Sequence, residues 1–320
     1  MKRLLPTLLS LLLGVFSEVY SQEYPNLVSP TKVTTIGYWY NGQSTDYHVK
    51  ETHASYKGKS EKPFKSTTSE YDIQLKVTDS TATSYEFEME YTNYVPDAEA
   101  QQFIRKMAEL QNNLPIRYRT NELGQFDTIL NLEELQQQLI GKLELCVTYI
   151  EEEEDEMKEI YKMVISNMSE QFKQLESIEA LFLTDILMIH GFYGLEMQQG
   201  KPLDIELNYP TIGDIVLTGT GKVNLNAINK SKDECTFSTT EKPDRDELSQ
   251  YMGSLALLFM MDSGKKISME ELSISMNTRK KMKMELSSGW MNSVEQTTTT
   301  KLTNKKGDQK KVTTQTYTRN

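Results

Sequence analysis

The sequence predicts an α+β protein made of curved antiparallel β-sheet of half-barrel type, with helices packed on the concave face and one long, acidic, amphipathic helical segment. Three observations lead to this fold class. Apolar and polar residues alternate through much of the chain, which is typical of strands with one buried face. Two stretches with helical spacing interrupt the strands, and each begins with Pro-Asp. About 70 residues in the middle carry apolar side chains three and four positions apart.

The N-terminus has the features of a signal peptide over residues 1–21. Lys2 and Arg3 precede a short apolar stretch, and Val19 and Ser21 give a small-x-small cleavage pattern. The stretch is too short to span a bilayer comfortably, and no cysteine follows it for lipid attachment. We therefore expect a secreted or periplasmic protein that does not span a membrane, with residues 22–320 forming one mature domain.

The clearest strand pair lies between residues 71 and 91. Four apolar side chains are expected on its buried face and three glutamates on its exposed face: Tyr85, Phe87, Met89 and Tyr91, against Glu86, Glu88 and Glu90. Upstream, residues 32–40 and 47–57 are predicted as two further strands joined through Asn41-Gly42, a dipeptide that favours tight hairpin turns.

One order of elements occurs twice, which predicts two similar lobes over residues 32–130 and 200–320. Each lobe has a hairpin, a helix that begins at Pro-Asp, and a second hairpin with a glycine turn. The matching positions are Pro96-Asp97 with Gly124, and Pro243-Asp244 with Gly289. Asp97 is a candidate helix N-cap, and Asp244 with Glu247 forms a candidate capping box. The alternative is a chance similarity of common β-elements.

A helical segment, residues 131–197, is predicted to join the lobes. It carries 15 acidic and 4 basic residues between Asn131 and Gly200. We expect a capping box at Asn131 and Glu134, a break near the acidic run Glu151–Glu156, and a second helix capped by Ser177 that ends at His190. The last strands, Thr297–Leu302 and Lys311–Tyr317, are predicted as a solvent-facing hairpin whose edge is protected by lysines.

Composition and motifs exclude several classes of function. A net charge of −11 disfavours nucleic-acid binding. The acidic run lies in a helical pattern without glycine, so it is a solvated helix face rather than a calcium loop. His48 and His53 fall on opposite strand faces, and His190 lies at a helix end, so no zinc site is expected. With no catalytic motif, the sequence predicts a protein without cofactor or metal that is not an enzyme.

Two cysteines, Cys146 and Cys235, allow two interpretations. An exporting compartment permits a disulfide between them. Both also lie on apolar faces, where a free cysteine is an ordinary small core residue.

The closing pattern Met284-Glu-Leu-Ser-Ser-Gly289-Trp290, followed by a long Thr-rich strand, resembles secreted bacterial proteins that are similar in plan to periplasmic lipoprotein carriers of the LolA type. The resemblance implies a half-barrel that cradles helices and a non-enzymatic protein that binds an apolar or lipid-like ligand, or a partner protein of the envelope. The expected groove is lined by adaptable apolar side chains: Tyr85, Phe87, Met89, Tyr91, Leu255, Phe259 and Met260. The competing hypothesis is a structural or adhesive cell-surface protein that uses its sheet edges.

Overall fold

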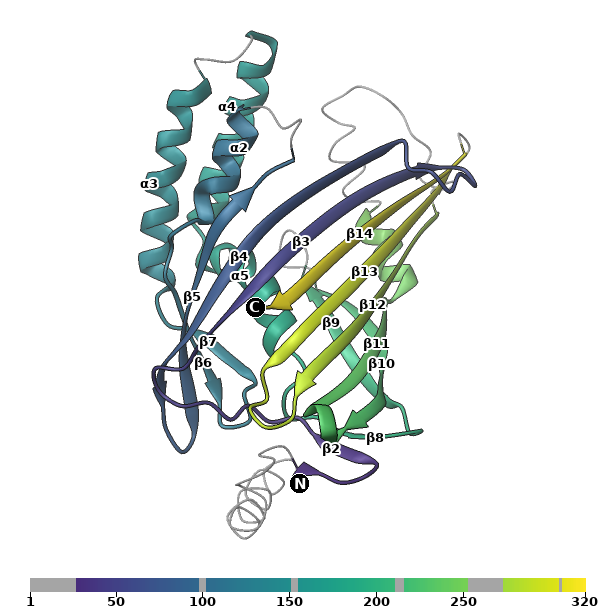
Figure 1. The fold of residues 1–320 in the computed structure, drawn as a ribbon. Coiled ribbons are helices and arrows are strands. Elements are labelled where there is room, and N and C mark those ends of the chain that lie inside the picture. Colours follow the sequence, from purple (N-terminus) through teal and green to yellow (C-terminus); the bar gives the residue numbers. More distant parts are fainter. Residues whose placement is uncertain (1–26, 98–101, 151–154, 211–215, 253–272, 305–306) are drawn as a thin grey trace.

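The computed structural model describes residues 27–97, 102–150, 155–210, 216–252, 273–304 and 307–320. They form an α+β fold in which antiparallel sheet predominates (Figure 1). The large sheet has eleven of the described strands, in the order β7-β6-β5-β4-β3-β14-β13-β12-β11-β10-β9. Their bounds are β3 (Ser44–Lys57), β4 (Lys65–Ser80), β5 (Ser84–Val95), β6 (Ile116–Asn121), β7 (Phe126–Ile129), β9 (Leu203–Pro210), β10 (Val216–Asn229), β11 (Glu234–Pro243), β12 (Ser273–Glu285), β13 (Met291–Asn304) and β14 (Gly307–Arg319). The sheet is not closed, so β7 and β9 are its edges.

The pairing of β14 with β3 joins the two runs of strands into one sheet. The register places Thr313 opposite His53 and Tyr317 opposite Val49. The predicted C-terminal hairpin is confirmed as β13 and β14, but its expected exposed edge is wrong, because β14 pairs with β3 and β13 pairs with β12. Threonine suits any strand with a half-buried face, so its abundance there does not tell a central strand from an edge strand.

A second, three-stranded sheet contains β1 (Leu27–Val28), β2 (Lys32–Thr34) and β8 (Glu196–Gln198). The prediction of a hairpin between residues 32–40 and 47–57 is wrong, because β2 pairs with β1 and β8 instead of β3. After β2, the main-chain N–H groups of Thr35, Gly37 and Tyr38 donate to the carbonyls of Leu195, Leu123 and Ser288. This crossing segment therefore contacts both halves of the chain.

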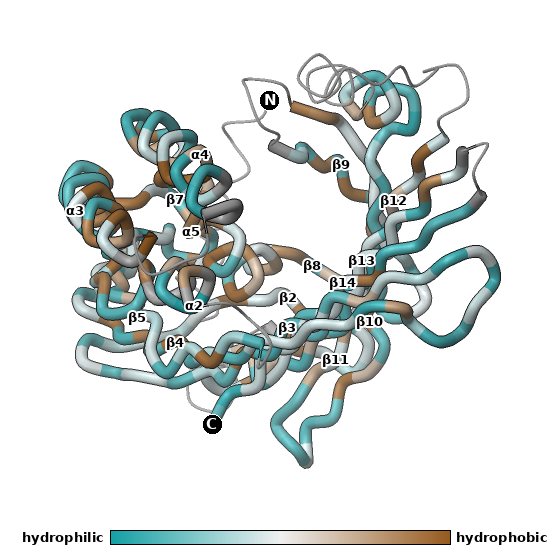
Figure 2. The backbone as a smooth tube through the Cα atoms, turned by 90° about the horizontal axis from the view of Figure 1, so that it is seen from above, coloured by the Kyte–Doolittle hydropathy of each residue, from teal (hydrophilic) through white to brown (hydrophobic). Residues whose placement is uncertain are grey.

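The helices are α2 (Gln102–Ala108), α3 (Leu132–Ile150), α4 (Asp155–Phe172) and α5 (Leu175–His190), and residues 245–252 are also helical. Short 3-10 turns, η1 (Glu109–Gln111) and η2 (Lys230–Lys232), complete the described elements. Figure 2 shows α2 to α5 grouped beside the β4 and β5 end of the sheet. The predicted helical segment is thus confirmed as α3 to α5, while residues 151–154 of the acidic run lie outside the described residues. No helix in the described part of the chain combines the length and apolarity needed to cross a membrane.

Two of the predicted helix caps are wrong. The Asn131 side chain accepts from the Arg117 N–H (2.9 Å) and donates to the Pro115 carbonyl (2.8 Å), so it anchors α3 to β6. Glu134 forms an ion pair with Arg117 instead of returning to the cap (2.6 Å). Helix α5 begins before Ser177, and its N-cap residue, Gln174, makes no side-chain capping hydrogen bond. In both cases tertiary contacts take precedence over the local capping pattern.

The cap at Asp244 is confirmed, since its Oδ1 accepts from the N–H groups of Asp246 and Glu247 at 2.9 and 3.0 Å. Glu247, the predicted second residue of the capping box, does not return to the cap. Its Oε2 instead accepts from the main-chain N–H of Thr218 at 2.6 Å. Asp97, the other predicted cap, accepts from the Thr68 N–H (3.0 Å), and the residues that follow it, 98–101, lie outside the described range.

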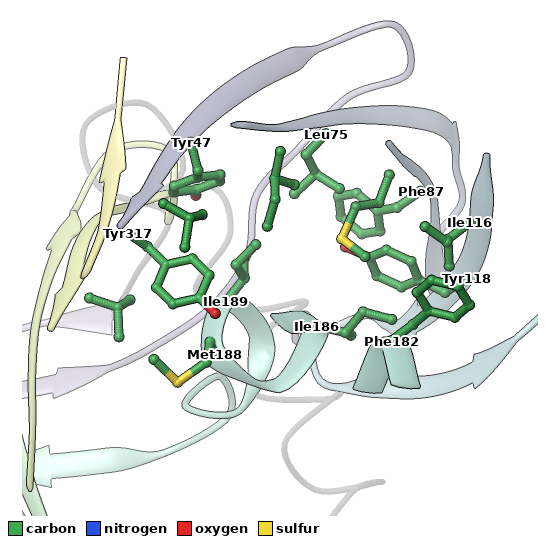
Figure 3. Close-up of a cluster of buried hydrophobic side chains, with 14 of the residues drawn as sticks. Tyr47, Leu75, Phe87, Ile116, Tyr118, Phe182, Ile186, Met188, Ile189 and Tyr317 are labelled. Carbon is green, nitrogen blue, oxygen red and sulfur yellow. The ribbon is translucent and has the colours of Figure 1, made fainter. Parts of the chain in front are cut away.

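The core forms where the apolar faces of the strands meet α5. Residues Tyr85, Phe87, Met89 and Tyr91 are buried as predicted, whereas Glu86, Glu88 and Glu90 are half-buried rather than exposed. Figure 3 shows Phe182, Ile186 and Ile189 of α5 pointing into the same cluster as the strand side chains. Helix α5 is therefore the element that covers the centre of the sheet.

Candidate functional site

A pocket of about 270 Å³ lies between the helices and the first half of the sheet. Strands β3, β4 and β5 contribute to one wall, and α2, η1, α3, α4 and α5 contribute to the other. Most of the lining is apolar or aromatic, with a few polar groups: Glu51, Tyr71, Tyr91, Tyr94, Met107, Leu110, Gln111, Asn112, Leu139, Met168, Phe172 and Leu181. An apolar pocket with a few placed polar groups is the usual form of a small-molecule site.

Two lining tyrosines are fixed by a buried carboxylate. Tyr91 Oη donates to Asp185 Oδ2 at 2.6 Å, and Tyr71 Oη donates to Asp185 Oδ1 at 3.2 Å. Tyr317 of β14 donates to the same carboxylate. Burial raises the pKa of Asp185 above its ordinary value, and the three donated hydrogen bonds act in the opposite direction. The cluster holds the aromatic rings at the pocket in place and commits their hydroxyl protons to Asp185.

Glu51 brings a half-buried carboxylate to the pocket. Its Oε1 accepts from Gln315 Nε2 at 3.1 Å and lies 3.3 Å from His53 Nε2. Gln315 in turn accepts from Gln296 (3.1 Å), so side chains of β3, β14 and β13 form a hydrogen-bonded row. The strand register continues the row to Lys280, which lies opposite Gln296. The row fixes the position of the Glu51 carboxylate on the inner face of the sheet.

The η1 end of the pocket adds amide groups. Asn112 Oδ1 is buried and has no hydrogen-bond partner among the described residues. The Lys142 ammonium donates to the main-chain carbonyl of Asn112, and burial lowers the pKa of Lys142. A buried oxygen without a partner costs free energy.

The start of β5, at the other end of that strand from the pocket, packs in a cluster of aromatic rings. The ring centroid of Trp39 lies 4.9 to 5.6 Å from the centroids of five neighbouring rings: Tyr85, Phe87, His190, Tyr193 and Trp290. His190 Nδ1 donates to the Gly124 carbonyl (3.0 Å), and its Nε2 lies 2.7 Å from Tyr118 Oη. Burial lowers the pKa of His190 to about 4. Desolvation of the buried ring therefore outweighs the favourable field of the helix C-terminus.

The structure places the predicted groove residues in different parts of the molecule. Tyr91 lines the pocket, whereas Tyr85 and Phe87 pack in the aromatic end and Met89 is fully buried. Leu255, Phe259 and Met260 lie outside the described residues, so that wall of the groove stays a prediction.

The two cysteines are free and buried, Cys146 on α3 and Cys235 on β11. The disulfide that the sequence left open is not formed, and burial raises the pKa of the Cys235 thiol to about 12. Each is a small core residue, the second interpretation offered by the sequence.

Sequence reasoning missed the pocket residues other than Tyr91. Met107, Leu139 and Phe172 belong to recognisable helix faces, but helical periodicity does not reveal which faces meet. Glu51 gives no local signal at all, because its position opposite Gln315 arises from a contact across 264 positions of the chain.

The described residues contain no group of three or more histidine, cysteine or acidic side chains arranged to hold a metal ion. His48 and His53 point to opposite faces of β3 as expected, His48 toward Asp72 (2.8 Å) and His53 toward Thr313 (3.0 Å).

Comparison with known proteins gives only a distant likeness. No family model matches the chain, and no curated protein matches it. One similar solved structure, which concerns lipid-protein interactions in lipovitellin, has 11% sequence identity and a TM-score of 0.39. The alignment covers 88% of this chain and 25% of that one, so this chain spans about a quarter of the length of lipovitellin. The fold and pocket by themselves define a class: an open antiparallel sheet with helices beside it and a pocket of mixed apolar, aromatic and polar lining between them.

Proposed function

We propose that this is an exported, non-enzymatic envelope protein that binds an apolar or lipid-like ligand in the pocket between α2–α5 and β3–β5. The observation that carries the proposal is the pocket itself, which combines about 270 Å³ of space with a lining of aliphatic and aromatic side chains among a few polar groups. Export through the predicted signal peptide, residues 1–21, and a half-barrel plan in which the sheet cradles the helices are parts of the same proposal.

The size of the pocket limits the ligand. Pockets for drug-sized molecules usually span about 300 to 1,000 Å³. A pocket of about 270 Å³ suits one alkyl chain or ring system, so we infer that a single chain of an amphiphile is the part enclosed. Met107 and Met168 in the lining are flexible and polarizable, which favours tolerance of chains of different length.

Filling the pocket tests this function. Leu181 of α5 lines the pocket, and we expect Leu181→Trp to weaken binding of the neutral apolar dye N-phenyl-1-naphthylamine at least tenfold, because the indole occupies the space of the ligand. Dye fluorescence titration measures the effect on the purified mature protein. Native mass spectrometry of protein from its own host then shows whether an apolar molecule co-purifies.

The control is Leu187→Trp, the same change on the same helix at a side chain that is 42% exposed. It should leave dye affinity within about twofold, since it adds surface area away from the pocket. A wild-type protein that folds but binds no apolar dye would defeat the proposal, as would equal losses in the two variants.

A structural or adhesive role is the second candidate, and the open sheet supports it. Among the described strands, β9 (Leu203–Pro210) pairs with β10 alone, which makes it an edge of the sheet. Such an edge can accept a strand from another chain. This function becomes the better one if the pocket binds nothing while the protein assembles through β9.

A further inference from the structure

Resting on the proposed function, we propose that the pocket selects an amphiphile with a hydrogen-bond-donating, amine-type head group over one with a carboxylate head. The alkyl chain lies among the apolar helix residues, and the amine is held by Glu51. The proposal concerns the class of ligand, which the apolar lining alone does not define.

The charge of the lining is the first argument. Among the twelve lining residues, Glu51 is the one carboxylic acid, and none is lysine, arginine or histidine. A carboxylate ligand would place a second negative charge beside a half-buried one, at a position where water screens poorly. An ammonium group would instead form a charge-assisted hydrogen bond.

The balance of donors and acceptors is the second argument. Tyr71 and Tyr91 use their hydroxyl protons on Asp185, so neither proton is free for a ligand. Asn112 Oδ1 is a buried acceptor without a partner among the described residues. Gln111, Asn112 and Tyr94 each bring a group that can donate as well as one that can accept, so the Glu51 carboxylate is the lining group that only accepts and that favours a donor head.

The position of Glu51 is the third argument. Its contacts with Gln315 and His53 both use Oε1, so Oε2 is the oxygen available to a ligand. The row of Gln315 and Gln296 behind it holds the carboxylate in one place, which reduces the entropy lost on binding. His53 contacts the Glu51 carboxylate from β3 itself. At the η1 end, the Lys142 ammonium donates to the main-chain carbonyl of Asn112.

Competition among matched ligands tests the inference. Dodecylamine, dodecanol and dodecanoic acid share one chain length, and each displaces N-phenyl-1-naphthylamine from the full mature chain at pH 7.5, below its aggregation concentration. We expect the amine to bind at least tenfold more tightly than the acid, with the alcohol between them. Glu51→Gln should remove the difference between amine and acid while leaving the alcohol within about twofold.

Two further variants keep the result interpretable. Glu90→Gln removes the same charge on β5, next to Tyr91 but on the opposite strand face, and should keep the wild-type preference. Gln111→Lys adds a positive charge at the η1 end and should shift the preference toward the acid even if Glu51→Gln does not fold.

Equal affinity for amine and acid, or tighter binding of the acid, in a wild-type protein that binds the alcohol would overturn the head-group inference alone. Failure to bind all three ligands would overturn the proposed function as well.

Discussion

At the scale of single residues, His190 shows how burial determines chemistry. Its ring is enclosed by Trp39, Phe87, Tyr118 and Tyr193. The hydrogen bond to the Gly124 carbonyl places the proton on Nδ1, so Nε2 accepts from Tyr118, whose own pKa is raised by burial. The neutral imidazole is thus a structural connector between α5, β6 and the turn at Gly124.

Acidification should destabilise the protein through His190. Burial lowers the pKa of the folded imidazole to about 4 from 6.5, so between these values the unfolded chain binds a proton that the folded chain does not. Stability therefore falls as pH falls from 6.5 to about 4, by roughly 3 kcal/mol in total. Guanidinium unfolding at pH 7 and pH 4.5 should show a smaller loss of unfolding free energy in His190→Gln than in the wild type, because glutamine keeps a donor and an acceptor without titrating.

Asp185 has a raised pKa and acts in the opposite sense, but it is present in both the wild type and the variant. Parallel pH dependence in the two proteins would show that His190 does not govern acid stability.

At the scale of elements, the turns are fixed by glycines with positive φ. Gly289 lies in the turn between β12 and β13 at φ 77°, and its carbonyl accepts from the buried Tyr193 hydroxyl. A Cβ at this position would lie 2.2 Å from the Ile36 carbonyl oxygen, in the segment that crosses beneath both halves of the sheet. The turn therefore needs glycine for its backbone conformation and for close packing.

Gly289→Ala should cost clearly more stability than the same change at Gly200. Gly200 has φ 73° and no atom within 4 Å of an added Cβ, so Gly200→Ala bears the cost of the backbone conformation alone, about 1 kcal/mol. We expect Gly289→Ala to lose about 1 to 3 kcal/mol beyond that, because the crossing segment must move. Guanidinium denaturation of the two variants measures the difference, and equal losses would mean that the segment shifts without cost.

At the scale of the whole molecule, α5 and the β3–β14 pairing unite the two halves of the chain. The Asp185 carboxylate receives Tyr71 from β4, Tyr91 from β5 and Tyr317 from β14. These strands come from opposite ends of the sequence, so one buried side chain connects the central helix with both halves of the sheet.

Asp185→Ala should therefore destabilise the entire fold. It leaves three tyrosine hydroxyls in the core without their acceptor, and each unpaired buried group costs about 1 to 3 kcal/mol. We expect a loss of at least about 3 kcal/mol in equilibrium unfolding, with the neighbouring Thr184→Ala, at an exposed position, within about 0.5 kcal/mol of wild type. A loss below about 1 kcal/mol for Asp185→Ala would show that the hydroxyls find other partners.

Much of the architecture was determined by the sequence alone, because strand and helix periodicity are local. The alternation at Tyr85–Tyr91, the turns at Gly124 and Gly289, the cap at Asp244 and the helices over 132–150, 155–172 and 175–190 all follow from near neighbours, and the structure confirms them. The two similar lobes stay a prediction. Tertiary structure alone decided what depends on distant partners: the central place of β14, the path of residues 35–43, the side-chain role of Asn131, and the meeting of Glu51 with helices α2–α5 around one pocket. The physical reason is that the local alternation of apolar and polar residues determines which side chains are buried. Which buried faces pack against each other depends on the packing of the whole molecule, because many strand and helix faces have similar sequences.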